Sequence, residues 1–298
     1  MGTVSEGSKA GRFRFIETHR DAFGVRYLCK RLAVSPAGFY KWVSRKESVR
    51  DVKNRALAQE IKQIFVEHNG NYGSPRVYSE LRANGHRVNK KRVERLMRHV
   101  GLVGKAGRIY RRKALAGNPC IRVANNRMGL EAPTRPNQQW AGDVTYLKVN
   151  GQWFYLAVIL DLYSRRIVGW SLDRSRTVEL TTAALENALA HREVEPGMVF
   201  HSDRGSEYGA FSYQQALKRA GITPSMNRPK HMTDNAHVES FFRTMKTESF
   251  KGLEFGSMNE LRVTLSWYID NYYNTQRRHS GLGYKIPSEY EQRAARAH

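Results

Sequence analysis

QQWAGDVTYLKVNGQWFYLAVILDLYSRRIVGWSLDRS, residues 138–175, is the stretch of sequence that decides the fold. It is rich in Val, Ile, Tyr, Phe and Trp, which are residue types enriched in β-strands. The Asn-Gly pair at 150–151 separates two strand-like runs, and this pattern predicts a β-hairpin. RRIVGWSL, residues 165–172, predicts a third strand. The stretch therefore predicts three consecutive antiparallel strands.

Helical and strand patterns alternate after these three strands. Short strands are predicted over residues 197–203 and 222–227, and helices over residues 177–192, 212–221, 233–250 and 259–276. Three antiparallel strands followed by alternating helices and strands predict an α/β core with a mixed sheet.

The positive charge is concentrated in the N-terminal part of the chain. The formal net charge is +23 over 298 residues, and residues 1–130 hold 29 Lys and Arg against 9 Asp and Glu. The remaining residues hold 21 Lys and Arg against 18 Asp and Glu. A basic segment joined to a nearly neutral one indicates a polyanion-binding module attached to a different domain.

The basic part has two helical patterns with a break in each. The first is RDAFGVRYLCKRLAVSPAGFYKWVSR, residues 20–45, in which Ser35 is a candidate N-cap and Pro36 suits the first helical turn. The second covers residues 55–102, and its last helix places Lys90, Lys91, Arg92 and Arg95 on a polar side. Both patterns are typical of helix-turn-helix DNA-binding domains, although small helical bundles that bind no DNA share them.

These observations predict three segments. We expect an N-terminal helix-turn-helix-like segment over residues 1–54, a second basic helical DNA-binding region with a linker over 55–125, and the α/β core with a C-terminal helix over 126–298. No apolar run is long enough to span a bilayer, so we expect a cytoplasmic protein and no membrane partner. Cys29 and Cys120 belong to no CxxC pair, so neither a zinc site nor a disulfide is predicted.

Three carboxylates stand where a phosphoryl-transfer site could form. Asp143 interrupts the otherwise apolar and aromatic strand at 139–147, where an edge position facing solvent is the alternative. Asp203 ends the strand at 197–203, a common place for ligands, although a turn or capping Asp would look the same. Carboxylate oxygens are the hard ligands that Mg²⁺ prefers.

Glu239 is the third carboxylate, on the predicted helix TDNAHVESFFRTMKTESF, residues 233–250. At helical spacing, Val238, Phe241, Phe242 and Met245 form an apolar face, and Asn235, Glu239, Arg243 and Lys246 form the polar arc beside it. Glu239 therefore points along the margin of the packed face, where a partly buried site can form. Lys246 and Arg243 are predicted to face DNA, with ordinary surface charges as the alternative.

Three motifs together resemble those of insertion-sequence transposases of the DDE type, the OrfB-like proteins with a retroviral-integrase-like catalytic core. The motifs are WAGDVTYL at 140–147, HSDRGSEY at 201–208 and DNAHVESFFRTMKTE at 234–248. Asp203 and Glu239 have 35 residues between them, and Lys246 follows Glu239 by seven, as in that family. NYYNTQRRHSGLGYKIPSEY at 271–290 and the basic segment at 72–104 also resemble the family, so the resemblance covers most of the chain from about residue 20.

The resemblance implies a ribonuclease H-like fold and a metal-binding catalytic triad of Asp143, Asp203 and Glu239. It implies two Mg²⁺ or Mn²⁺ ions, double-stranded DNA as partner (element ends and target), and an enzyme that cuts DNA and joins the 3′-OH to another strand. Synapsis of two ends implies a homo-oligomer. In that family the active product is often a frameshift fusion, so a fusion segment or partner from an upstream frame is a further expectation. Asn235 and His201 are expected to support the site, His201 in a structural or phosphate-contacting role.

One departure from the family concerns SMNRPKHMTDNA, residues 225–236, where the family often has a small flexible Gly and this chain has Pro229. The departure bears on loop mobility and DNA contacts and leaves the triad intact. Two other functions remain open at this point. One is a DNA-binding regulator with an inactive core, and the other is a ribonuclease H-like nuclease without strand transfer.

Overall fold

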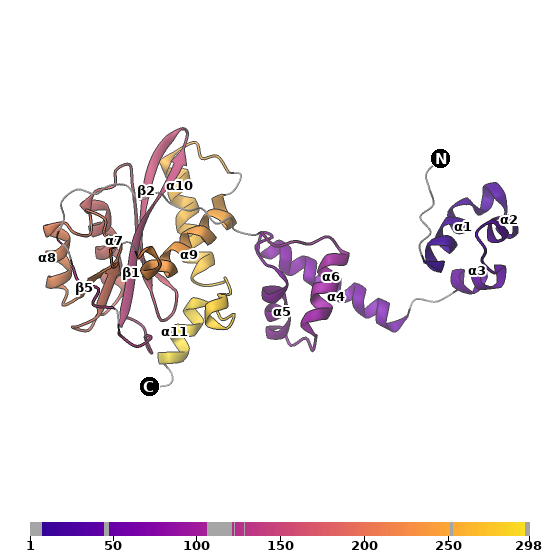
Figure 1. Ribbon diagram of the computed structural model, residues 1–298, viewed down its shortest axis with the longest axis horizontal. Coiled ribbons are helices and arrows are strands. Elements are labelled where there is room, and N and C mark those ends of the chain that lie inside the picture. The colour runs from indigo at the N-terminus through magenta and orange to yellow at the C-terminus, as the bar shows by residue number, and fades with distance from the viewer. Residues whose placement is uncertain are drawn as a thin grey trace. The chain divides into compact units, whose positions relative to one another are not determined.

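The computed structural model describes residues 8–44, 48–105, 121, 123–127, 129–229, 231–250 and 253–295 (Figure 1). The chain divides into two compact units, Met1–Gln59 and Glu60–His298. Cys120 and the rest of residues 106–120, in the predicted basic linker, lie outside the described residues. The domain boundaries after residues 54 and 125 stay predictions.

The first unit is a small helical bundle. It contains α1 (Lys9–Phe23), α2 (Val25–Arg31), α3 (Pro36–Val43) and the beginning of α4 (Val49–Glu67). Its core consists of Phe13, Ile16, Leu28, Cys29 and Phe39. Ser35 caps α3 as predicted, because its Oγ accepts a hydrogen bond from the Gly38 N–H, and Pro36 follows at the first helical position. The predicted break between two helices in residues 20–45 is confirmed.

The second unit begins with the basic helices. The end of α4 is followed by α5 (Ser74–Ala83) and α6 (Lys90–His99). Asn89 caps α6 by accepting a hydrogen bond from the Lys91 N–H at 2.9 Å. The apolar face of α6 is buried through Val93, Leu96 and Met97, so its cationic side is the one left toward solvent.

A five-stranded mixed sheet follows, with strand order β3-β2-β1-β4-β5. The strands are β1 (Gln139–Val149), β2 (Gln152–Asp161), β3 (Ile167–Asp173), β4 (Val199–Ser202) and β5 (Thr223–Met226). β1, β2 and β3 pair antiparallel, while β4 pairs parallel to both β1 and β5. Asn150 and Gly151 both have positive φ, which is what the two central residues of a type I′ hairpin turn require. The prediction from residues 138–175 is therefore confirmed.

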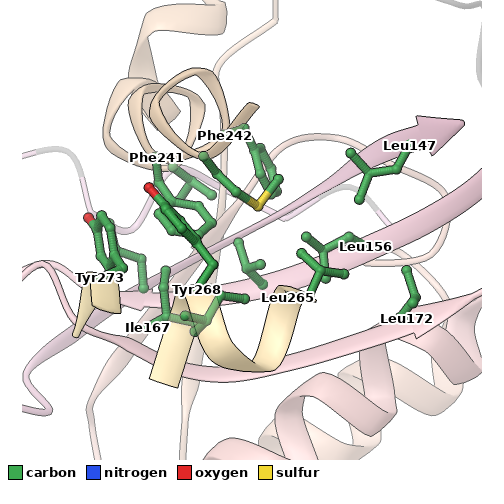
Figure 2. Packing of buried hydrophobic residues seen from close by; sticks show 14 of the residues in the cluster. Leu147, Leu156, Ile167, Leu172, Phe241, Phe242, Leu265, Tyr268 and Tyr273 are labelled. Carbon is green, nitrogen blue, oxygen red and sulfur yellow. The ribbon is translucent and has the colours of Figure 1, made fainter. Parts of the chain in front are cut away.

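Helices cover both faces of the sheet (Figure 1). On one face, α7 (Val178–His191) and α8 (Phe211–Arg219) pack on residues such as Trp140 and Val144. On the other, α9 (Ala236–Met245), α10 (Met258–Ser266) and the π-helical segment η3 (Trp267–Tyr273) pack on the opposite side of the same strands. Figure 2 shows Phe241 and Phe242 of α9 beside Leu147 and Leu156 of the sheet in this core.

The two helices predicted at 233–250 and 259–276 are present, but each includes turns that are not α-helical. A 3₁₀ turn, η1 (Met232–Asn235), precedes α9, and a π-helical turn, η2 (Lys246–Phe250), continues it. η3 continues α10 in the same way, and η4 (Ser280–Leu282) and α11 (Pro287–Ala295) complete the chain. Among the residues that the structure describes, no helix has the length and apolar character needed to cross a membrane.

Candidate active site

Asp143 and Asp203 stand at the same level on adjacent parallel strands. The register pairs Gly142 of β1 with Ser202 of β4; Asp143 is the next residue of β1, and Asp203 directly follows the last residue of β4. Asp143 is buried, with 2% of its surface exposed, and its Oδ1 accepts a hydrogen bond from the Val144 N–H at 2.7 Å. The edge-strand alternative, in which Asp143 faces solvent, is therefore wrong.

Gly142 leaves room for the side chains of Phe200 and Tyr208 on one face of the sheet. A Cβ at this position would lie 2.5 Å from Cζ of Phe200 and 3.3 Å from the hydroxyl of Tyr208. A side chain is thus excluded directly before Asp143, on the face opposite to that of the aspartate.

Asp203 opens a turn at the carboxyl end of β4. Its Oδ1 accepts a hydrogen bond from the Gly205 N–H at 2.9 Å, and its Oδ2 lies 3.8 Å from a guanidinium nitrogen of Arg176. About a third of its side chain is exposed, at 34%. A ligand arriving from solvent can therefore reach Asp203, whereas Asp143 forms the floor beside it.

Arg176 and Glu207 form an ion pair at this site that sequence reasoning missed. Nε of Arg176 donates a hydrogen bond to Oε1 of Glu207 at 2.7 Å, and Glu207 is only 4% exposed. Burial by itself would lower the pKa of Arg176, but the carboxylates of Glu207, Asp203 and Asp143 raise it above the ordinary value. Arg176 thus balances the negative charge that the aspartates bring together.

The start of α9, the helix that carries Glu239, is tied to β1 beside Asp143. Nδ2 of Asn235 donates a hydrogen bond to the carbonyl oxygen of Gly142 at 2.9 Å, which ties the residue before α9 to the residue before Asp143. Glu239 follows Asn235 by four residues, about one helical turn, and lies half-buried on that side of the helix. The apolar face of α9 is fully buried, so the rotation of the helix that presents Glu239 is set by the core (Figure 2).

The three predicted carboxylates do not form a ready-made metal cluster. Within the described residues, no group of three or more His, Cys, Asp or Glu side chains is placed to hold a metal ion. Asp203 contacts Gly205 and Arg176 in this arrangement. The structure therefore brings together the elements that carry the three carboxylates, with Asp143 and Asp203 side by side, and leaves their joint coordination untested.

Comparisons with known proteins assign the family. Integrase core domain models match residues 133–232 and 220–287, and a model of an HTH-like domain matches residues 52–113. The InsF transposase for insertion sequence IS3A of Escherichia coli K12 is 36% identical over 283 residues, which are 94% of this chain and 98% of that protein. The chain belongs to this family of insertion-sequence transposases. The transposase of IS904 from Lactococcus lactis is likewise 36% identical over 251 residues, covering 83% of this chain and 98% of that one.

Solved structures of retroviral integrases are more distant from this transposase. The HTLV-2 integrase catalytic core domain in complex with magnesium is 19% identical, with a TM-score of 0.41 over 53% of this chain and 98% of that chain. The simian T-cell lymphotropic virus intasome in complex with PP2A regulatory subunit B56 gamma gives a TM-score of 0.44 at 18% identity, over 74% of each chain. The matched integrase core domain and the mixed sheet confirm the predicted ribonuclease H-like core with a helical region before it.

The predicted DNA-contacting side chains of the transposase lie on α6 and on α9 with the turn η2 that continues it. Lys246 follows the last residue of α9, and its Nζ donates a hydrogen bond to the carbonyl oxygen of Tyr146 at 2.9 Å. Arg243, on the same helix, is exposed. Of the four predicted cations on α6, Lys90, Lys91 and Arg95 are exposed and Arg92 is half-buried. Their contact with DNA stays a prediction.

His201 lies in β4 and is fully buried. One ring nitrogen is 2.9 Å from Oγ of Ser225, and the other is 2.8 Å from Oδ1 of Asn227, so the imidazole bridges β4 to β5 and the residue after it. Burial lowers the pKa of His201 to about 4, and the ring is neutral at neutral pH. Of the two roles expected for His201, this geometry fits the structural one.

A second buried cluster, also missed from sequence, connects the basic helices to the core. Nε and one terminal nitrogen of Arg277 donate to the two carboxylate oxygens of Glu248 at 2.7 and 2.8 Å, and Tyr268 donates to the same carboxylate at 2.9 Å. Arg76 of α5 lies 3.6 Å from it. Arg278 pairs in the same bidentate manner with Glu80 of α5, at 2.7 and 2.9 Å. The Arg277–Arg278 pair of the C-terminal family motif therefore anchors α5 to the core.

Proposed function

We propose that Asp143, Asp203 and Glu239 are the catalytic residues of this transposase, and that they hold two Mg²⁺ or Mn²⁺ ions. The observation that supports this most strongly is the alignment of Asp143 with Asp203, next to the point where Asn235 fastens α9 to β1. All three candidate ligands are carboxylates, which fits a hard divalent cation that keeps several waters. Two such ions, when bound, supply the charge that activates an attacking oxygen and stabilises a leaving one.

In this proposal the reaction occurs in two steps at one site. A water first attacks the phosphodiester at an element end, which leaves a 3′-OH on the element and a 5′-phosphate on the flanking DNA. This 3′-OH then attacks a phosphodiester of the target strand and displaces the 3′-oxygen of the neighbouring target nucleotide, which leaves as a 3′-OH. Asp143 supplies a fixed ligand from the floor of the site, and Asp203 an accessible one at its opening. The rigid anchoring of α9 sets the position of Glu239. No covalent bond between protein and DNA is needed, so the tyrosines of the core have no nucleophilic role.

Assembly and partners complete the proposal. Joining two element ends to one target requires two active sites, so we propose a homo-oligomer on double-stranded DNA. The basic helices α4–α6 bind the duplex, with Lys90, Lys91, Arg92 and Arg95 near its phosphates, and Arg243 and Lys246 contact DNA close to the cut. We further propose that the chain acts in the bacterial cytoplasm on nucleoid DNA, and that a segment from an upstream frame joins it in the active form.

The test is strand joining on labelled element-end DNA with Mg²⁺. We expect the unmodified protein to cut and join, chelation of the metal by EDTA to stop both steps, and Asp203→Asn or Glu239→Gln to abolish joining while DNA binding persists. Glu186→Gln, an exposed carboxylate on α7, is the matched control and retains activity. Joining at the unmodified level by either site variant would refute the assignment. Binding without cleavage by the unmodified protein would indicate an inactive regulator, and cleavage without joining a plain nuclease.

A further inference from the structure

The tip of the β1–β2 hairpin carries an exposed aromatic pair that the proposed site does not use. Tyr146 and Trp153 are 49% and 50% exposed. Their ring centroids are 5.0 Å apart and their planes are nearly perpendicular, at 87°. Large half-exposed rings that touch each other in this way leave an apolar surface open to solvent, and such surfaces commonly mark contact sites.

A lysine lies over each ring. Nζ of Lys148 is 5.6 Å from the centroid of Trp153, and Nζ of Lys246 is 4.7 Å from the centroid of Tyr146. We call these four residues, Tyr146, Lys148, Trp153 and Lys246, the hairpin patch. It combines π surfaces with positive charge, and this combination suits a nucleic-acid strand, whose bases stack and whose phosphates are anionic.

Tyr146, Lys148 and Trp153 lie on the α7–α8 face of the sheet, opposite to the face of Asp143, and Lys246 connects the two faces around the edge of β1. β4 pairs with β1 only at Gln139–Gly142, so beyond Gly142 no described strand covers that edge of β1. Lys246 reaches across this edge to the Tyr146 carbonyl. Tyr146 is three residues past Asp143, a distance of about 10 Å along a strand, and Lys246 is seven past Glu239, also about 10 Å along a helix.

Tyr146 and Lys246 therefore lie at similar distances, measured along strand and helix, from the carboxylates of the proposed site. At about 3.4 Å per nucleotide along one strand of a duplex, 10 Å corresponds to about three nucleotides. A strand whose phosphate lies at Asp143 and Glu239 would reach the hairpin patch by passing over the open edge of β1, where Lys246 lies.

We propose that the hairpin patch binds unpaired bases of the DNA end next to the cut. The bases stack on Trp153 and Tyr146, and Lys148 and Lys246 neutralise the adjoining phosphates. This inference rests on the proposed function, because it assumes that the carboxylates act on a DNA end. It adds that the terminal base pairs are opened during binding and that the hairpin holds one of the separated strands.

The test compares two DNA probes in EDTA, so that no chemistry occurs. One is a short fully paired duplex, and the other is the same duplex with a few unpaired nucleotides on each strand at one end. We expect the full-length protein to prefer the forked probe by about fivefold or more, because each stacked base contributes on that order. Trp153→Ala removes the preference and Trp153→Phe retains it. Phe211→Ala, an exposed aromatic residue on α8, leaves both affinities unchanged.

A second readout reports stacking directly. A 2-aminopurine in the unpaired arm loses fluorescence when it stacks on an aromatic ring, so quenching is expected with the unmodified protein and with Trp153→Phe, and none with Trp153→Ala. Equal affinity for the two probes, or an unchanged preference in Trp153→Ala, overturns the proposal. A change of oligomeric state in Trp153→Ala with no change in fork preference also overturns it, and shows the patch to be an interface between copies. Because these assays need no catalysis, they remain informative if the carboxylate variants refute the proposed function.

Discussion

Glu248→Gln is expected to destabilise the second unit strongly. Glu248 and Arg277 are nearly buried, with side chains 5% and 4% exposed, and they form two hydrogen bonds. Burial alone would lower the pKa of Arg277, but the carboxylate of Glu248 raises it above its ordinary value. The substitution keeps the shape of the side chain and removes its charge, which leaves a buried guanidinium without its main counter-charge.

The expected magnitude follows from this burial. Removing one partner of a buried ion pair costs about 3–5 kcal/mol, because the other charge stays desolvated. In a unit of this size, each kcal/mol lowers the melting temperature by about 2–4 °C, so we expect a decrease of about 10 °C. The double variant Glu248→Leu/Arg277→Met removes both charges. It should lose less stability than the sum of the two single variants, because no buried charge is left unpaired within this pair.

The measurement is thermal and urea unfolding followed by near-ultraviolet circular dichroism. Glu195→Gln is the matched control, since Glu195 forms a bidentate pair with Arg135 but both side chains are largely exposed, at 69% and 42%. We expect its transition to coincide with that of the unmodified protein. A decrease of less than about 2 °C for Glu248→Gln, or strictly additive effects in the double variant, would refute the reasoning.

Three further outcomes are expected. Gly142→Ala should lower the stability by about 1–3 kcal/mol in urea unfolding, because its Cβ would lie 2.5 Å from Phe200, whereas Gly256→Ala meets only an ordinary contact at 3.6 Å and should be neutral. The pKa of His201 is lowered to about 4, so the unfolded chain binds the proton first. The stability that neutral His201 contributes is fully present above about pH 6.5 and is lost as the pH falls toward 4. The urea midpoint should therefore depend less on pH in this range for His201→Gln than for the unmodified protein, and an equal pH dependence in the two proteins would contradict this. Lys246→Ala should weaken DNA binding at low salt and reduce the slope of log affinity against log salt by about 1, while an unchanged slope would exclude a phosphate contact.

The parts of the fold that were predictable from sequence are the local ones. The Asn-Gly turn fixes which residues of β1 and β2 pair, and the alternation of side chains along a strand then fixes which residues face which layer of helices. The apolar arc of α9 similarly determined which side of the helix is buried. Asp143 could be selected because a carboxylate inside an apolar strand is unfavourable without a special reason.

The parts that were not predictable depend on partners far apart in sequence. Arg176 pairs with Glu207, 31 residues later, and Arg278 pairs with Glu80 across 198 residues. Surface arginines and glutamates are common, and no local pattern distinguishes one that becomes buried against a distant partner. The π-helical turns were missed for a related reason. At η2 and η3 the extra residue per turn reorients side chains toward tertiary partners such as Glu248 and Tyr268, which helical periodicity does not encode.

One continuous helical segment joins the candidate site to the basic helices. Its beginning, Asn235, is bonded to the carbonyl of Gly142 beside Asp143. Glu248 lies near its end. The carboxylate of Glu248 contacts Arg277 and also Arg76, which belongs to α5. The backbone carbonyl of Glu248 accepts a hydrogen bond from Lys105 at 3.2 Å. Glu239 lies between these two anchors. A displacement of α5 by bound DNA would therefore act on the C-terminal anchor of the segment that positions Glu239, while the N-terminal anchor holds it to the sheet.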